Sequence, residues 1–374
     1  MTLSTLYHKG KNGELRQWRV WTEGADILTE HGVFGGAMQT SRKTAEPKNV
    51  GKANETSPEE QAILESKSLW TYKVERKYSE TPEGAQEQLP LPMLAHKFKG
   101  KKRSGFQYPG HAQRKLDGVR CLAQRAEDGS IALTSRGGKP WNIPLVAAQL
   151  DKWLPEGMVL DGELYIHGLS CQRITSLAKS SDPSGKSYKP ESAGLIYHVY
   201  DMPTYNCDDT LMWRERNGLL LSFAESLTSD NVCLVETILV KNDAEVVAFE
   251  DMALSEHYEG LIVRTLSGRY IWGYRSNDLL KLKVFEDAEF TVLGGTDGVG
   301  KAKGTVVFIC KNDLTDATFD CTMKGVLAER SRFYREREQY MGKQLTVRFF
   351  GRTDAQIPRH PVGIVFRDEK DLPL

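Results

Sequence analysis

The sequence predicts an α+β protein of several domains. Its 374 residues are enough for two or three domains, each with a core of its own. Residues 79–92 are rich in Pro, Glu and Gln and poor in apolar residues, which is typical of a linker. From about residue 287, short strands replace the strands and helices that precede them. We therefore expect a β-rich module at 1–78, a linker at 79–92, a core at 93–286 and a C-terminal domain at 287–374.

The composition excludes several classes of protein. Basic and acidic side chains number 50 each, so the net charge is zero and any nucleic-acid-binding surface must be local. The sequence contains no apolar run long enough to span a membrane, and its start lacks the pattern of a signal peptide. The six cysteines are scattered and form no Cys-x-x-Cys pair. We expect reduced thiols of a cytoplasmic protein, not zinc ligands or disulfides.

The first module alternates apolar and polar residues, as half-buried strands do. This pattern occurs around Tyr7, around Trp18 and at residues 26–30. A helix is expected to begin at Ser57, because serine is a good N-cap and Pro58 suits the first turn. Two acidic residues that follow favour the positive end of that helix.

The remaining elements divide into a mixed core and a β-rich end. They are strands at 119–124 and 131–135, helices at 143–153 and from Trp213, strands at 290–293, 304–309, 345–350 and 363–366, a turn at 294–298 and a helix at 327–340. Several short strands around one helix, as at the C-terminal end, suit an OB-fold barrel.

One lysine organises the core. Lys115 lies in residues 113–120, which are Gln-Arg-Lys-Leu-Asp-Gly-Val-Arg. This stretch is predicted to be mostly a β-strand, in which Lys115 and Asp117 would share one face. A lysine that attacks phosphorus must be neutral part of the time, and burial, neighbouring cations and a bound metal lower its pKa. Alone, this stretch fits a solvated turn equally well.

Further motifs follow in a fixed order. They are Ser135-Arg136-Gly137-Gly138, Asp161-Gly162-Glu163, Tyr197-His198-Val199-Tyr200-Asp201, Glu259-Gly260-Leu261-Ile262-Val263-Arg264 and Lys281-Leu282-Lys283. Singly, each fits an ordinary turn, an exposed strand or core aromatic residues. Six motifs in one order are a strong signal.

In these motifs the sequence resembles the ATP-dependent DNA ligases, and most of all the compact ligases of bacteriophages. Messenger RNA capping enzymes and RNA ligases share the motifs in looser form. The resemblance runs from about residue 92 to the C-terminus. It implies a nucleotidyltransferase core of antiparallel sheets with flanking helices, followed by an OB-fold barrel. The first module faintly resembles the nucleic-acid-binding WGR domains, which suggests an accessory role on DNA.

The resemblance also implies the chemistry. Lys115 would attack the α-phosphorus of ATP and hold AMP, which then passes to the 5′-phosphate of nicked duplex DNA. The cofactors would be ATP and Mg²⁺, with Mn²⁺ as a substitute. Glu259 and Glu163 would bind the metal, and Glu163 also the ribose. We expect a monomer that closes around DNA in a bacterial or phage-infected cell.

The other motif residues would bind the nucleotide. Arg120 and Arg136 would hold phosphate or ribose; Lys281 and Lys283 would neutralise the α-phosphate. Tyr200 would stack on adenine, with Tyr197 as the alternative on the opposite strand face. Ile262 would contact the other face of the base, and Gln113 would lie at its edge. Arg367 and Lys370 would orient pyrophosphate, and the basic run at 97–103 would contact DNA phosphates.

Three departures from the family and two alternative functions stay open. Arg264 stands where many relatives have lysine, and tyrosine occupies both aromatic places of the motif at 197–201. The last motif, usually Arg-x-Asp-Lys, reads Arg-Asp-Glu-Lys from Arg367. The alternatives are an RNA ligase or capping guanylyltransferase, which would differ in nucleotide or acceptor, and a non-catalytic nick-binding protein. An NAD⁺-dependent ligase is disfavoured, because its zinc-binding cysteines are missing from the sequence.

Overall fold

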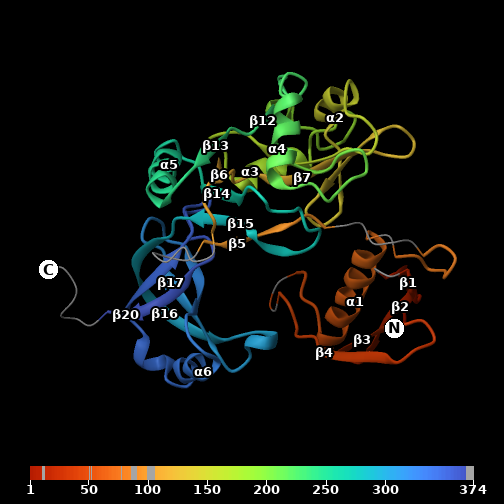
Figure 1. Cartoon of the computed structure of the whole chain (residues 1–374). Helices are drawn as coiled ribbons and strands as arrows, with labels where there is room; N and C mark the ends of the chain where they lie inside the picture. The colour runs from red at the N-terminus through yellow and green to blue at the C-terminus, as the bar shows by residue number, and fades with distance from the viewer. Residues whose placement is uncertain are drawn as a thin grey trace.

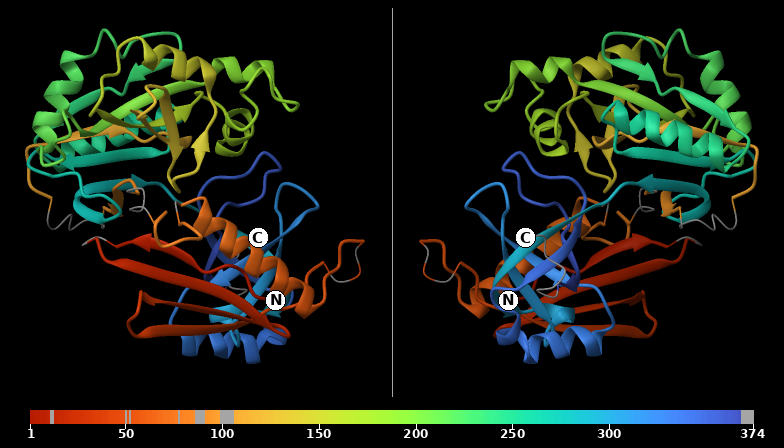
Figure 2. Two further views of the ribbon diagram at one scale, coloured as in Figure 1. Left: turned by 90° about the vertical axis from the view of Figure 1, so that its right-hand side faces the viewer. Right: turned by 90° about the vertical axis from the view of Figure 1, so that its left-hand side faces the viewer.

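The structure is a computed structural model that describes residues 1–10, 13–49, 51, 53–76, 78–85, 91–98 and 106–367. It has three parts (Figure 1): the core above, the C-terminal barrel in blue at lower left, and the first module in red and orange at lower right. The side views in Figure 2 also place the two smaller parts below the core. Among the described residues, no helix has the length and apolar character needed to cross a membrane.

The first module is an antiparallel sheet with one helix on it. Its strands pair in chain order and its helix, α1, contacts the two central strands. The elements are β1 (Leu6–Lys9), β2 (Leu15–Glu23), β3 (Asp26–Val33), β4 (Met38–Thr44) and α1 (Pro58–Val74). The helix begins where it was predicted, because the Ser57 hydroxyl accepts from the Glu60 amide and the Glu60 carboxylate accepts from the Ser57 amide. Just after the module, Ser79 forms an antiparallel bridge with Tyr7.

Two sheets form the core. The six-stranded sheet has the order β12-β11-β10-β7-β8-β9 and the five-stranded sheet the order β13-β6-β14-β15-β5. All neighbours are antiparallel except β11 with β12 and β15 with β5. The strands are β5 (Leu94–Lys97), β6 (Gly110–Arg114), β7 (Val119–Arg125), β8 (Ile131–Ser135), β9 (Pro140–Trp141), β10 (Val159–Tyr165), β11 (Ile196–Thr204), β12 (Val232–Leu234), β13 (Thr237–Val240), β14 (Gly260–Thr265) and β15 (Arg275–Lys283).

Helices flank the two sheets. α3 contacts β7 and β10, α4 contacts β11, and α5 contacts β6, β13 and β14. The helices are α2 (Pro144–Asp151), α3 (Cys171–Ala178), α4 (Trp213–Ser222) and α5 (Asp243–Ser255), with a short 3-10 helix, η1 (Pro190–Gly194). Each sheet packs against its helices through a separate cluster of buried apolar side chains. The predicted core of antiparallel sheets with flanking helices is therefore confirmed.

The C-terminal part is a closed five-stranded barrel in the order β16-β17-β18-β20-β19. Its elements are β16 (Glu286–Asp297), η2 (Gly300–Ala302), β17 (Val306–Lys311), β18 (Thr318–Met323), α6 (Leu327–Arg335), η3 (Arg337–Tyr340), β19 (Gln344–Phe349) and β20 (Val362–Phe366). Phe290, Phe308 and Phe349 fill its interior. A barrel of this kind confirms the OB-fold prediction.

The predicted turn at 294–298 is wrong, because β16 continues through it to Asp297. The strand pairing shifts between Val292 and Gly294, as at a β-bulge. Gly295 lies opposite Phe308, and a β-carbon there would meet that ring at an ordinary contact distance of 3.4 Å. The two glycines lie at this irregularity within the strand and do not end it.

Polar contacts join the three parts. Arg359 of the barrel binds both carboxylate oxygens of Asp117 in the core, at 2.7 and 3.3 Å. Ser170 of the core donates to Asp354 of the barrel at 3.1 Å. Glu75, just after α1, pairs with Lys139 at 2.7 Å, on the turn that also carries Arg136.

Candidate active site

A cavity of about 480 Å³ lies between the two core sheets. Strands of both sheets contribute side chains to its walls, and its size suits a small-molecule ligand. Nine of the predicted site residues line it: Gln113, Lys115, Arg120, Arg136, Glu163, Tyr200, Ile262, Lys281 and Lys283. The motifs are far apart in the sequence, and the pairing of the strands brings them to one place.

Lys115 follows directly after β6 and is not part of the strand. The prediction that it shares a strand face with Asp117 is wrong, since β6 ends at Arg114 and Asp117 turns to the barrel to bind Arg359. The Lys115 amide donates to the Gly260 carbonyl at 2.9 Å, and the Glu259 amide donates to the Lys115 carbonyl at 3.1 Å. These bonds hold the lysine backbone against the turn that begins β14.

The environment of Lys115 favours a neutral amine. Burial, followed by the charge of Lys283, lowers the pKa of Lys115 to about 8. Glu163 and Asp117 act in the opposite direction but do not cancel these effects. Near neutral pH the unprotonated fraction of this lysine is therefore still minor, but it is far larger than that of an ordinary lysine, as a nucleophile requires.

Glu259 lies between two lysines. One carboxylate oxygen contacts the Lys115 ammonium and the other contacts that of Lys283. The Glu259 side chain is only 1% exposed, so this carboxylate depends on the two cations to offset its desolvation. The arrangement is a cluster of alternating charges that an incoming cation or phosphate can rearrange.

Glu163 and Arg120 lie on neighbouring strands of the six-stranded sheet. Burial raises the pKa of Glu163 to about 7. Arg120 binds Asp161 from Nε at 2.9 Å and from Nη2 at 2.5 Å, and donates from Nη1 to the Met93 carbonyl at 2.6 Å. Protein groups therefore hold the Arg120 guanidinium, which restricts the phosphate or ribose contact predicted for it.

The expected adenine slot has Tyr200 on one side. Tyr200 and Ile262 both line the cavity, from β11 and β14. Tyr197, the alternative stacking residue, is fully buried in the core, where its hydroxyl donates to the Cys121 carbonyl at 3.1 Å. The structure therefore favours Tyr200. Gln113 is 2% exposed and lies at the cavity wall beside it.

Four of the cations that line the cavity lie close enough to affect one another. Burial, followed by the charges of Lys283, Arg275 and Arg136, lowers the pKa of Lys281. Arg136, Lys281 and Lys283 were predicted, and Arg275 was not. Arg275 is the first residue of β15 and lies six residues before Lys281. It belongs to none of the motifs, so nothing in the sequence pointed to it. This concentration of positive charge suits a polyphosphate.

Arg367 lies outside the cavity. It binds Glu289 on the barrel at 3.0 and 3.2 Å, and its side chain is exposed. The structure therefore does not bring it to the nucleotide site as predicted, because the last strand of the barrel directs it along the barrel surface. Lys370 and residues 99–103 of the basic run lie outside the described residues.

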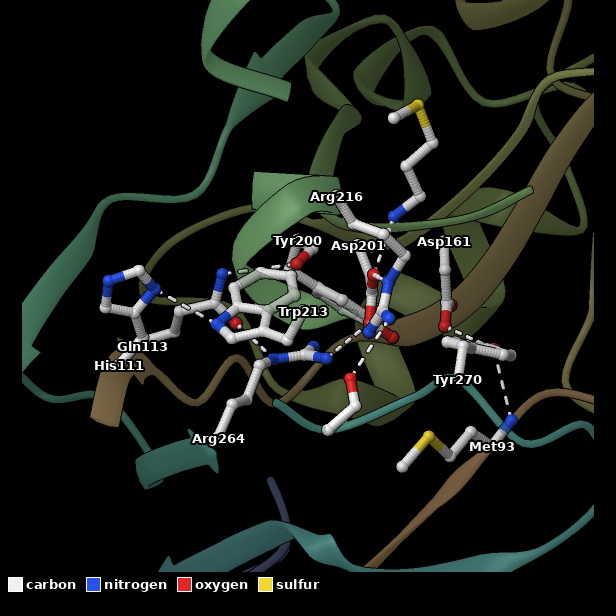
Figure 3. A network of polar contacts seen from close by, with 12 residues as sticks. Met93, His111, Gln113, Asp161, Tyr200, Asp201, Trp213, Arg216, Arg264 and Tyr270 are labelled. Carbon is white, nitrogen blue, oxygen red and sulfur yellow. Dashed lines mark hydrogen bonds and ion pairs between the residues drawn. The ribbon is translucent and has the colours of Figure 1, made fainter. Parts of the chain in front are cut away.

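Sequence reasoning also missed a set of buried polar residues behind the cavity. Asp201 accepts hydrogen bonds from Arg216 and Arg264, and Tyr270 donates to Asp161 at 2.7 Å (Figure 3). These five residues are at most 4% exposed. The available signal was the charge of Asp201 and Arg264 within otherwise apolar strands. Such residues require buried partners.

Comparison with known proteins assigns the family. A family model described as ATP dependent DNA ligase domain matches residues 92–283. A DNA ligase of African swine fever virus is 31% identical over 303 residues, which cover 77% of this chain and 69% of the viral protein. The DNA ligase of enterobacteria phage T4 is 25% identical over 335 residues, covering 74% of this chain and 68% of the phage protein.

Solved structures show the same fold. Pmar-Lig_PreS3 superposes with a TM-score of 0.65 at 19% identity, over 76% of this chain and 69% of that chain. A structure from work on DNA binding by Lig E DNA ligases has a TM-score of 0.60 at 22% identity, over 75% of this chain and the whole of that chain. The resemblance predicted from the ordered motifs is thus confirmed. This chain belongs to the family of ATP-dependent DNA ligases, which are covalent nucleotidyltransferases.

Proposed function

We propose that this chain seals 3′-hydroxyl/5′-phosphate nicks in duplex DNA, and that Lys115 carries the AMP. The observation that supports this most directly is the position of Lys115 in the cavity, buried, next to Glu259 and with its pKa lowered to about 8. Such a lysine is a nucleophile at neutral pH. The family assignment supplies ATP and nicked DNA as the substrates.

The reaction has three steps. The neutral Lys115 amine attacks the α-phosphorus of ATP; an N–P bond forms, the bond to pyrophosphate breaks, and the amine loses a proton. A 5′-phosphate oxygen of the nick then attacks the same phosphorus, which breaks the N–P bond and frees Lys115. Finally the 3′-hydroxyl attacks the activated 5′-phosphorus, releasing AMP and closing the strand.

Positive side chains would stabilise the charge that builds up on phosphate. Lys281 and Lys283 leave the same face of β15 toward the cavity, and Lys283 already contacts Glu259. Arg136 lies at an exposed part of the wall, where a DNA 5′-phosphate can reach it. Fixed cations of this kind act at the transition state without a reorganisation cost.

The carboxylates fit a magnesium ion. Within the described part of the chain, no group of three or more His, Cys, Asp or Glu side chains gathers as a preformed metal site. Mg²⁺ is usually held by one or two carboxylates together with substrate phosphates and water. Glu259 and Glu163 provide two carboxylates, and Glu259 would exchange its lysine contacts for the ion. The bound ion would neutralise phosphate charge.

The base would lie between Tyr200 and Ile262, with Gln113 at its edge. For the whole molecule we propose a monomer that closes around DNA in the cytoplasm of a bacterial or phage-infected cell. The first module would add contacts to DNA. Its compact sheet and helix, and its contact with the turn that carries Arg136, support an accessory position near the site.

The test is transfer of label onto the protein. The chain is incubated with Mg²⁺ and ATP labelled in the α-phosphate, and with labelled GTP in parallel, and is then denatured. A portion kept native is chased with nicked duplex DNA. We expect label from ATP that leaves during the chase, no label for Lys115→Ala, and unchanged labelling for Lys311→Ala, an exposed lysine on the barrel.

The other outcomes separate the alternatives. Label from GTP alone would indicate a capping guanylyltransferase, and label that leaves only to nicked RNA would indicate an RNA ligase. If no label appears, pyrophosphate is added to release AMP from protein that was purified already adenylylated. If this is also negative, the chain is a non-catalytic nick-binding protein.

A further inference from the structure

Behind the proposed base slot, one buried carboxylate holds two arginines (Figure 3). Asp201 has no exposed surface. Arg216 donates to it from Nε at 2.7 Å and from Nη2 at 3.2 Å, and Arg264 donates to it from Nη1. Asp201 therefore anchors both guanidinium groups.

Arg264 connects Asp201 to Gln113, which lines the cavity. Its Nε donates to Oε1 of Gln113 at 3.1 Å, and its guanidinium lies 4.4 Å from the centre of the Trp213 ring. Arg264 is 4% exposed. Asp201, Gln113 and the aromatic face thus restrict it from three directions, which leaves it little freedom to turn.

These contacts determine which way the Gln113 amide points. Its Nε2 donates to the Thr237 hydroxyl at 2.9 Å and to the Tyr200 carbonyl at 3.2 Å. Turning the amide over would place its NH₂ against a guanidinium that only donates and its oxygen against a carbonyl that only accepts. Both N–H groups are therefore used, and the amide can offer a ligand only the second lone pair of Oε1.

We propose that Asp201 and Arg264 are positioning residues that select the nucleobase through Gln113. They hold Oε1 as an acceptor on Gln113, which lines the cavity together with Tyr200. An amino group at C6 of a purine can donate to this oxygen, whereas a keto oxygen at C6 would meet it as a second acceptor. This rests on the proposed function, since it takes the space between Tyr200 and Ile262 as the base slot.

The test compares two nucleotides that differ at one group. Self-adenylylation is measured in a single turnover against concentration, with ATP and with purine riboside triphosphate, which has hydrogen in place of the C6 amine. For Arg264→Lys, which keeps the charge on Asp201 but loses the Nε donor, we expect the half-saturating ATP concentration to rise about tenfold. The maximal rate should stay within about twofold, and half-saturation by the analogue should be unchanged.

Arg216→Lys is the matched control. Arg216 is as buried as Arg264 and binds the same carboxylate, but Gln113 is not among its partners in the described structure. Its substitution should leave the ratio of ATP to analogue affinity as in the wild type. If Arg264→Lys fails to fold by circular dichroism, Thr237→Val removes one acceptor of the amide without changing charge, and it should lower the same ratio.

Each result has one meaning. Equal weakening of ATP and analogue, or an unchanged ratio in both Arg264→Lys and Thr237→Val, would overturn the inference while leaving the enzyme an ATP-dependent ligase. No labelling of the wild type by ATP would instead overturn the proposed function. A ratio that falls in Arg264→Lys and Thr237→Val but not in Arg216→Lys supports the positioning role.

Discussion

At the scale of single residues, the site balances charges that burial makes costly. Glu259 is buried between Lys115 and Lys283, and Glu163 lies close enough to affect the same lysine. Glu259 favours the ammonium form of Lys115, whereas burial and Lys283 favour the amine. Burial is the largest influence and the charge of Lys283 adds to it, so the pKa of Lys115 falls to about 8.

This pKa predicts how the first step depends on pH. Below about 8 the amine of Lys115 is mostly protonated, so the rate of lysine adenylylation should rise about tenfold per pH unit between pH 6 and 7.5 and level off above about 8. Single-turnover labelling at saturating ATP and Mg²⁺ measures this. A profile that stays flat from pH 6 to 9 would contradict a titrating nucleophile.

At the scale of elements, the site depends on the close approach of strands. The loop after β6 passes over β10 at Gly118, where a β-carbon would lie 2.3 Å from the Leu164 carbonyl and 2.8 Å from Cγ of Glu163. Only a residue without a side chain fits this distance. The glycine of the Lys-x-Asp-Gly motif thus has a packing role between the nucleophile loop and the strand that carries Glu163.

Gly118→Ala should therefore displace Glu163 and strain β10. We expect a loss of about 1–3 kcal/mol in the free energy of unfolding and a fall of at least about tenfold in the rate of lysine adenylylation. Denaturant unfolding and single-turnover labelling measure the two effects.

Gly218→Ala is the control for this change. Gly218 is exposed within α4, and an added β-carbon would meet nothing within 4 Å. Alanine there should stabilise the helix by about 0.5–1 kcal/mol and leave labelling unchanged. Equal behaviour of the two variants would mean that the close approach at Gly118 has no part in the site.

At the scale of the whole molecule, the barrel contacts the nucleophile loop directly. Arg359 binds Asp117, two residues from Lys115, and Lys283 lies 4.2 Å from the centre of the Phe350 ring. The position of the barrel and the environment of the cavity are therefore linked. A movement of the barrel that releases Arg359 changes the charge beside Lys115.

A double-mutant cycle can measure this link. Arg359→Ala should slow lysine adenylylation, because the unpaired charge of Asp117 would raise the pKa of Lys115. Asp117→Ala removes that charge, so the double variant should be less impaired than Arg359→Ala alone, with a coupling energy of about 0.5–3 kcal/mol. The control is the exposed pair Asp287 and Arg348 within the barrel, whose cycle should give no coupling. Additive effects at Asp117 and Arg359 would argue against the link.

The first module provides a further prediction. It has its own apolar core, including Leu6, Trp18 and Val20. Removal of residues 1–85 should leave lysine labelling intact, raise the Kd for nicked DNA several-fold and make its dependence on salt shallower, because phosphate contacts are lost. Unchanged Kd and salt dependence in a filter-binding titration would mean that the module does not bind DNA.

Much of the site could be predicted because its chemistry is local in sequence. Lys115, Glu163, Glu259 and the two lysines of β15 each stand in a short motif whose residue types suit phosphate or metal. That these motifs would gather at one site was expected only through the resemblance. The pairing of β6 with β14 and of β7 with β10 explains how the motifs meet.

Other features of the structure could not be predicted from the amino-acid sequence. Arg367 looked like a site residue but pairs with Glu289 on the barrel. The glycines at 294 and 295 looked like a turn but lie within a strand, next to a shift in its pairing. The choice of Tyr200 over Tyr197 depended on which face of β11 meets the cavity. In each case the decisive partner comes from a distant element.

By itself, then, the sequence determined the family and the kind of fold and led to the proposal of Lys115 as the nucleophile, because these depend on motifs and periodicity within short stretches. Only the tertiary structure decided that Arg264 connects Asp201 to Gln113 across 63 and 151 positions of sequence. It also decided that Glu259 lies between two lysines. Burial is the physical reason: a charge out of water must find partners, and folding alone brings those partners within reach.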